Sequence, residues 1–176
     1  MNSKELPELL KSWDNLGALL QIINDSSHIQ LMVRFATDDS RPEYWRAAWL
    51  IDKANEKDKN LLVPYMPEIY AKIRTISNYS HIRHFLRIII SHPIPENEQI
   101  ALFDLSINLF VNNDVPVAVR ANAMELAFSI TKLNPELRPE MKQLLELLFE
   151  QYSTAGIRAK AKNLLAKLSK IQVINQ

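Results

Sequence analysis

The stretch DVPVAVRANAMEL, residues 114–126, contains a Val-Arg-x-x-Ala core that recurs in altered form along the chain. Aligned on the arginine, the four copies centre on Arg46, Arg83, Arg120 and Arg158, which are 37, 37 and 38 residues apart. A spacing this regular, and of this length, is typical of arrays of paired helices. The sequence therefore predicts an all-α fold built from helical hairpins.

Apolar residues at helical spacing divide the rest of the chain into further elements. They predict an N-terminal capping helix within residues 1–24, which covers the open end of the array. Four helical pairs follow, for a total of about nine helices and one domain over 1–176. The predicted pairs are residues 28–57, 59–91, 96–132 and 134–171.

The motif residues resemble those of the HEAT repeat family. The resemblance rests on the Val-Arg-x-x-Ala core in the second helix, on prolines near the first turns, and on Asp114 six residues before Arg120. It covers about residues 28–171 and implies a right-handed α-α superhelix whose second helices line a concave face. It also implies a structural ladder between repeats, formed by Asp114 and the four arginines, rather than a row of phosphate-binding residues.

The composition excludes several kinds of site. The 176 residues include no cysteine and two glycines, so disulfides, zinc-thiolate sites and Gly-rich phosphate loops are not expected. No metal or cofactor is predicted. The N-terminus lacks the pattern of a signal peptide, and no apolar run approaches the roughly 20 residues of a bilayer span. A cytoplasmic location without membrane contact is therefore expected.

The charge of the chain is near balance but unevenly distributed. The formal net charge is +1, yet residues 151–176 contain five basic residues and no acidic one. A basic final helix could attract an acidic partner, or it could simply complement the helix dipole near a C-terminus. Both interpretations remain open from the sequence.

The second helices also carry mixed apolar and charged residues away from their core positions, as an adaptable protein contact would. The leading hypothesis is a non-enzymatic scaffold that binds a protein or peptide on its concave face, as a monomer or weak homodimer. The predicted partner-binding residues are Leu50, His84, Arg87, Met124, Glu125, Phe128 and Lys162.

Asp52 is the one acidic residue at a core-facing position of the motif, and Trp45 and Trp49 share that face. Because a buried carboxylate needs a partner, Asp52 is predicted to pair with Arg83 or Arg87. The two tryptophans are predicted to lie in the core rather than to form a stacking platform for bases.

Two other functional classes provide alternatives. HEAT-like DNA-alkylation repair glycosylases hold a damaged base with aromatic residues, an Asp and an Arg, and the nearest set here is Trp49, Asp52 and Arg87. A near-neutral chain lacks the basic surface expected for DNA, so nucleic acid is not the favoured partner.

An all-helical lyase, such as adenylosuccinate lyase, would be more than twice as long and would carry a Gly-Ser-Ser-x-Met-Pro signature, so no enzyme is predicted.

Overall fold

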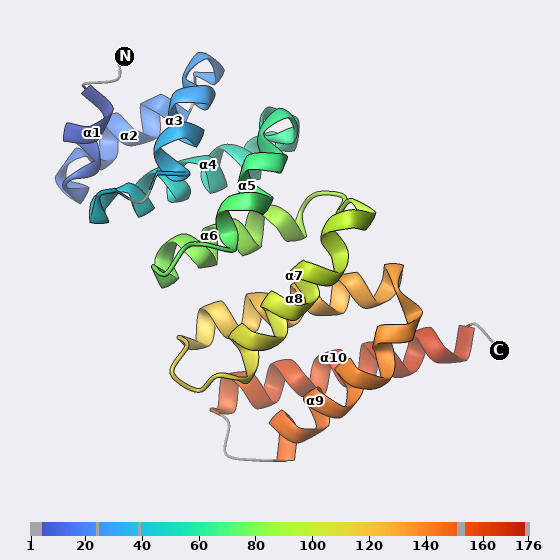
Figure 1. Ribbon diagram of the computed structural model, residues 1–176. Helices are drawn as coiled ribbons and strands as arrows, with labels where there is room; N and C mark the ends of the chain where they lie inside the picture. Colours follow the sequence, from blue (N-terminus) through green and yellow to red (C-terminus); the bar gives the residue numbers. More distant parts are fainter. Residues whose placement is uncertain (1–4, 24, 39, 151–153, 175–176) are drawn as a thin grey trace. The chain divides into compact units, whose positions relative to one another are not determined.

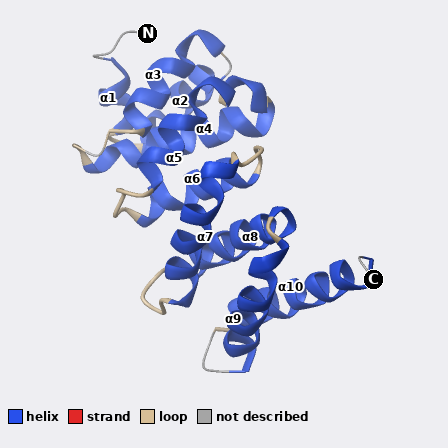
Figure 2. Ribbon diagram, turned by 45° about the vertical axis from the view of Figure 1, so that its right-hand side comes forward, coloured by secondary structure: helices blue, strands red, loops and turns tan. Residues whose placement is uncertain are grey.

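The computed structural model describes residues 5–23, 25–38, 40–150 and 154–174, and the regular structure within these ranges is entirely helical (Figures 1 and 2). The predicted all-α class is confirmed. The parts of the predicted ranges that fall on residues 1–4, 24, 39, 151–153 and 175–176 lie outside the described residues. The chain divides into two compact units, residues 1–92 and 93–176, and each is described by itself. The assignment of one domain over 1–176 stays a prediction.

Unit 1, residues 1–92, consists of short helices packed in pairs. Its α-helices are α1 (Glu5–Leu10), α2 (Leu16–Ile23), α3 (Ile29–Ala36), α4 (Trp45–Lys57), α5 (Met66–Ile73) and α6 (Tyr79–Ile90). Helix α3 packs on α4, and α5 packs on α6, within the predicted pairs 28–57 and 59–91. Helix α4 also packs on α2 and α6, so it has helical neighbours on three sides.

The N-terminal capping helix is interrupted, which the apolar spacing did not predict. Ser12 adopts an extended conformation, and its hydroxyl accepts a hydrogen bond from the Asp14 amide at 3.0 Å. A 3-10 turn over Trp13–Asn15 then separates α1 from α2. Because of this break, the described residues contain ten α-helices rather than about nine. A serine that competes locally for backbone hydrogen bonds explains the interruption.

Prolines shorten the first helix of the second pair. Two 3-10 turns, Lys59–Leu61 and Val63–Tyr65, precede α5, because Pro64 and Pro67 cannot donate helical hydrogen bonds. Asn78 then caps α6: its side chain accepts hydrogen bonds from the amides of Ser80 at 2.9 Å and His81 at 3.3 Å. Asparagine is among the preferred residues at this position.

Unit 2, residues 93–176, consists of four longer α-helices in its described part. They are α7 (Glu96–Val111), α8 (Val117–Leu133), α9 (Arg138–Glu150) and α10 (Ala155–Ile174). Helix α7 packs on α8, α9 packs on α10, and α8 also packs on α10. These pairs fall within the predicted ranges 96–132 and 134–171. A hydrogen bond of 2.6 Å from the Asn134 side chain to Gln99 links the end of α8 to the start of α7.

The motif residues predicted for the core are buried. Counted from the arginine, positions −1, +3 and +6 of α6, α8 and α10 are at most 5% exposed. In α4, Asp52 is 1% exposed, whereas Trp45 and Trp49 are half-buried. The predicted core face is therefore confirmed for α6, α8 and α10, whereas the two tryptophans of α4 lie only partly in the core. The handedness of the array and the number of repeats stay predictions.

Candidate functional site

The contact between α4 and α6 in unit 1 contains a buried ionic group, here named the α4–α6 polar cluster: Asp52, Glu56, His84 and Arg87. The Asp52 carboxylate lies 2.8 Å from Nδ1 of His84 and 3.3 Å from Nε of Arg87. Since a carboxylate only accepts, the imidazole nitrogen donates. Asp52 and His84 are 1% and 2% exposed. The predicted pairing of Asp52 with Arg87 is confirmed, and His84 is a partner that the sequence analysis missed.

The outer edge of this cluster reaches solvent. Glu56 pairs with Arg87 across the two helices and with Lys53 along α4, at 2.6 Å. The hydrogen bond from Lys53 lowers the pKa of Glu56 below its ordinary value, burial opposes this effect, and the charges of Lys53 and Arg87 reinforce it. Further along, Asn55 donates to the Ser91 hydroxyl at 2.9 Å. Polar side chains therefore link α4 to α6 along much of their contact.

Unit 2 contains a second group at the corresponding place, between α8 and α10. We name it the lysine cluster: Lys132, Lys160 and Lys167 around Glu125 and Phe128. Glu125 pairs with Lys160 and, at 3.8 Å, with Lys167. The ammonium groups of Lys132 and Lys167 lie 4.8 and 5.6 Å from the centroid of the Phe128 ring. Lysines from both helices therefore converge on one carboxylate and one aromatic ring.

Several of the residues predicted to meet a partner are not on the surface. Leu50 and Met124 are fully buried, and His84 and Phe128 are each 2% exposed. The expectation that these four side chains face solvent was wrong. Helix α4 packs on α2, α3 and α6, and α8 packs on α7, α9 and α10, so little of either helix is left uncovered.

The three remaining residues of the predicted strip have exposed surface but do not form one group. Arg87 belongs to the polar cluster of unit 1 and Glu125 to the lysine cluster of unit 2. Lys162 is exposed. At about 100° per residue, however, it lies about 200° around α10 from Lys160, and hence away from Glu125. The seven-residue spacing of Lys160 and Lys167 was the available signal for the cluster, because it places both on one helix face.

The four motif arginines do not share one role. Arg46 donates to the Leu10 carbonyl at 3.0 Å and lies over the rings of Trp13 and Trp45, at 5.3 and 5.0 Å from their centroids. It therefore ties α4 to α1 in the N-terminal capping region. Arg83 and Arg158, by contrast, are exposed.

Arg120 is the buried member of the four. It is 2% exposed and donates from Nε to the Phe110 carbonyl at 2.9 Å, at the end of the partner helix α7. Burial lowers the pKa of its guanidinium. Asp114 is exposed, and among the described residues Arg120 has no carboxylate partner. The hydrogen bond of Arg120 to Phe110 therefore lies within its own helical pair, and a ladder between repeats stays a prediction.

Two of the three residues compared with the DNA-repair glycosylases make contacts within the fold. Trp49 packs edge-on against Trp13, with the ring centroids 5.0 Å apart, and Asp52 is enclosed by its two partners. Within the described part of the chain, no group of three or more His, Cys, Asp or Glu side chains is arranged to hold a metal ion.

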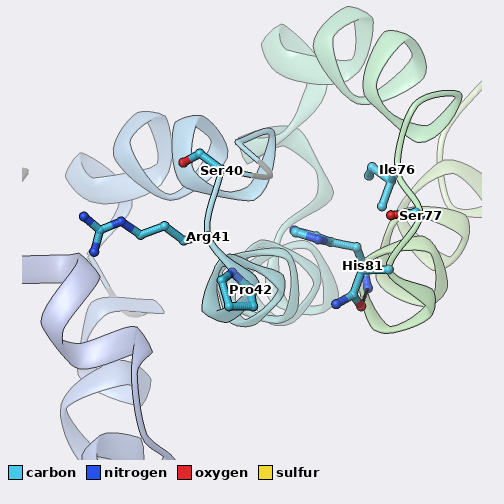
Figure 3. A pocket seen from close by; sticks show the side chains of 7 residues that line it. Ser40, Arg41, Pro42, Ile76, Ser77 and His81 are labelled. Atoms are coloured by element: carbon cyan, nitrogen blue, oxygen red, sulfur yellow. Dashed lines mark hydrogen bonds between the residues drawn. The ribbon is translucent and has the colours of Figure 1, made fainter.

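A small pocket of about 280 Å³ lies in unit 1, between the turn before α4 and the turn before α6 (Figure 3). It is lined by Ser40, Arg41, Pro42, Ile76, Ser77, Asn78 and His81. Arg41, its charged residue, points away from the His81 side (Figure 3). The charged side chain of the lining therefore does not join the polar groups on the His81 side, as a substrate site would require.

Packed helical pairs, with arginine-bearing second helices linked by polar side chains, define a helical-repeat scaffold. The comparison with protein families agrees: the model of the HEAT repeat domain matches residues 4–168. The chain belongs to the HEAT repeat domain family, and the resemblance drawn from the motif is confirmed. No curated protein and no solved structure matched the chain.

None of the helices in the described ranges combines the length and the apolar character needed to cross a bilayer. The location of the protein stays a prediction.

Proposed function

We propose that this chain is a non-enzymatic scaffold that binds a protein or peptide through the surfaces between its second helices, α4 with α6 and α8 with α10. Membership of the HEAT repeat domain family supports a scaffold. The observation that carries the proposal is that partly exposed charged side chains, Arg87 and Glu125, are held in place at these two surfaces by partners on the adjacent helix. Ordered charges of this kind favour specific protein contacts.

The geometry argues against acid–base catalysis at the most suggestive pair. A histidine and a carboxylate 2.8 Å apart, as in His84 and Asp52, form a unit that enzymes use for proton transfer. A catalytic group must reach its substrate, however, and these two side chains are 2% and 1% exposed. Their burial supports a structural role, in which they join α4 to α6.

Site-specific photo-crosslinking tests this proposal. A benzophenone amino acid is placed at Asn163, an exposed residue of α10 beside the lysine cluster, and in a matched control at Gln143, an exposed residue of α9. Both proteins are irradiated in an extract of the native cells. We expect discrete adducts with a second protein from position 163 and few from position 143. An adduct at twice the chain mass would identify self-association.

Two crosslinking results would contradict the scaffold proposal. If position 163 gives no protein adduct, or if both positions give the same diffuse adducts, the surface between α8 and α10 is not a binding surface.

A further inference from the structure

We propose that the lysine cluster of unit 2 binds an acidic segment of a partner protein, whose carboxylates pair with Lys132 and Lys167. This inference rests on the scaffold function proposed above and specifies the chemistry of the partner at one of its surfaces. It is carried by the charges, the geometry and the exposure of the cluster.

The cluster contains more positive than negative charge. Glu125 is its one acid, and it is shared by Lys160 and Lys167. Lys132 makes no ion pair with any residue that the structure describes. Helix α10 adds no compensating acid, because residues 155–174 contain five basic residues and no acidic one. The cluster therefore has a local surplus of positive charge, which favours a negatively charged partner.

The ring of Phe128 orders two of the lysines. It is 2% exposed, so its position is fixed by the core of unit 2. Lys132 and Lys167 hold their ammonium groups 4.8 and 5.6 Å from its centroid. Attraction between a cation and the ring face orients each ammonium group and leaves its other N–H donors for a second acceptor. Lysines ordered in advance lose less conformational entropy when a partner binds.

The cluster already accommodates a carboxylate. Glu125 lies between lysines of α10 with its side chain 28% exposed, and Lys167 is 48% exposed. A carboxylate of a partner can therefore reach Lys167 from solvent and extend the arrangement that Glu125 begins. An acidic peptide repeats this chemistry at short intervals.

Nucleic acid fits the same surface less well. Single strands bind to proteins through aromatic rings on which bases stack, and Phe128 is too buried to offer a face. The rest of the chain also disfavours a polyanion of high charge density, because residues 1–150 contain 16 basic and 20 acidic residues. Both observations therefore favour a partner that presents carboxylates over one that presents phosphates.

Fluorescence anisotropy with the full chain tests the inference. The probe is a fluorescein-labelled 12-residue peptide of alternating Glu and Ser. A peptide with Gln for Glu and a labelled 12-nucleotide oligo-dT are compared with it at 50 and 300 mM NaCl. We expect the Glu peptide to bind at low salt and weaken at high salt, and the Gln peptide not to bind.

Paired variants locate the site. The double variant Lys132→Gln, Lys167→Gln removes two charges from the cluster. It should weaken binding about tenfold, because each exposed charge contact contributes a factor of roughly three to five to the affinity. The control Arg158→Gln, Lys162→Gln removes the same charge from the opposite side of α10 and should leave binding within about twofold. Glutamine keeps most of the lysine stem, and circular dichroism checks that both variants fold.

Three results would overturn the inference: no binding of the Glu peptide, equal weakening by the two double variants, or binding of oligo-dT as tight as that of the Glu peptide. The scaffold proposal has its own readout. If photo-adducts at position 163 persist in the Lys132→Gln, Lys167→Gln variant, the chain binds a partner there, but not through these lysines.

Discussion

Replacement of Asp52 by asparagine should destabilise unit 1, because the carboxylate is the centre of the α4–α6 polar cluster. It is 1% exposed and contacts His84 and Arg87. Asparagine keeps the size of the side chain but removes its charge and one of its two acceptor oxygens. Both contacts of the carboxylate are made by Oδ2, so the amide oxygen can take that place, but His84, itself 2% exposed, and Arg87 then face a neutral group instead of an anion.

The magnitude follows from the two contacts. A buried hydrogen bond to a charged group contributes about 1.5–3 kcal/mol. The ion pair with Arg87, whose side chain is 39% exposed, adds about 0.2–1 kcal/mol because solvent screens it. Asp52→Asn should therefore lower the free energy of unfolding by about 2–4 kcal/mol at neutral pH.

Tryptophan fluorescence during urea unfolding provides a selective assay. The chain has three tryptophans, Trp13, Trp45 and Trp49, and all lie in unit 1. Their fluorescence therefore reports the unfolding of the unit that contains the substitution, whereas far-ultraviolet circular dichroism reports both units. The matched control is Asp104→Asn, at an exposed position of α7 in unit 2. It should leave the tryptophan transition unchanged.

A loss smaller than about 0.5 kcal/mol, the range of ordinary surface substitutions, would refute the reasoning. A double-mutant cycle with His84→Gln sharpens the test. If the carboxylate and the imidazole stabilise each other, the cycle should give a coupling energy of about 1 kcal/mol or more. If the two substitutions act independently, the contact at 2.8 Å between the carboxylate and the imidazole contributes little to stability.

Three further predictions concern other contacts. The pKa of Glu56 is lowered, so its contribution to stability is present above the ordinary value of 4.5 and is lost as pH falls through the lowered pKa; the difference in unfolding free energy between wild type and Glu56→Gln should therefore shrink as pH falls below 4.5. Arg120 is buried, and its Nη2 has no hydrogen-bond partner among the described residues. Arg120→Met should therefore lower the free energy of unfolding by less than about 1 kcal/mol, whereas Arg120→Ala, which leaves a cavity, should lower it by about 2 kcal/mol or more. Urea unfolding followed by circular dichroism measures both. Asn78→Ala removes the cap of α6 and should cost about 1 kcal/mol in the tryptophan-detected transition.

The periodic features of the sequence predicted the fold well. The regular spacing of the arginines identified the second helices, and the apolar residues around them identified the core face, because both depend on positions within one helix. The interruption at Ser12 was missed, since it depends on a local hydrogen bond to Asp14 that competes with the helix.

The exposed surface was harder to predict, because exposure depends on how many neighbours a helix has. Equivalent positions of the motif are buried at Leu50 and exposed at Lys162. Helix α4 packs on three helices, whereas α10 packs on α8 and α9. The lysine cluster was missed for a related reason: its members are brought together by the rotation of α10 against α8, which the arginine alignment does not determine.

The sequence did indicate which buried residue needed explanation. An aspartate at a core-facing position of the motif demanded a cationic partner, and Arg87 was one of the two predicted. His84 was overlooked because it was assigned to the opposite face of its helix. Buried charge is thus easier to predict than the identity of every group that neutralises it.

The polar cluster also bears on the order in which the chain folds during synthesis. Asp52 and its partner His84 are 32 residues apart, so the ribosome completes α4 well before α6 exists. Until then, the carboxylate has no imidazole to accept from and keeps its water, because dehydrating an unpaired charge is costly. The first helical pair therefore emerges with one polar group that delays its final packing, and the arrival of α6 completes it.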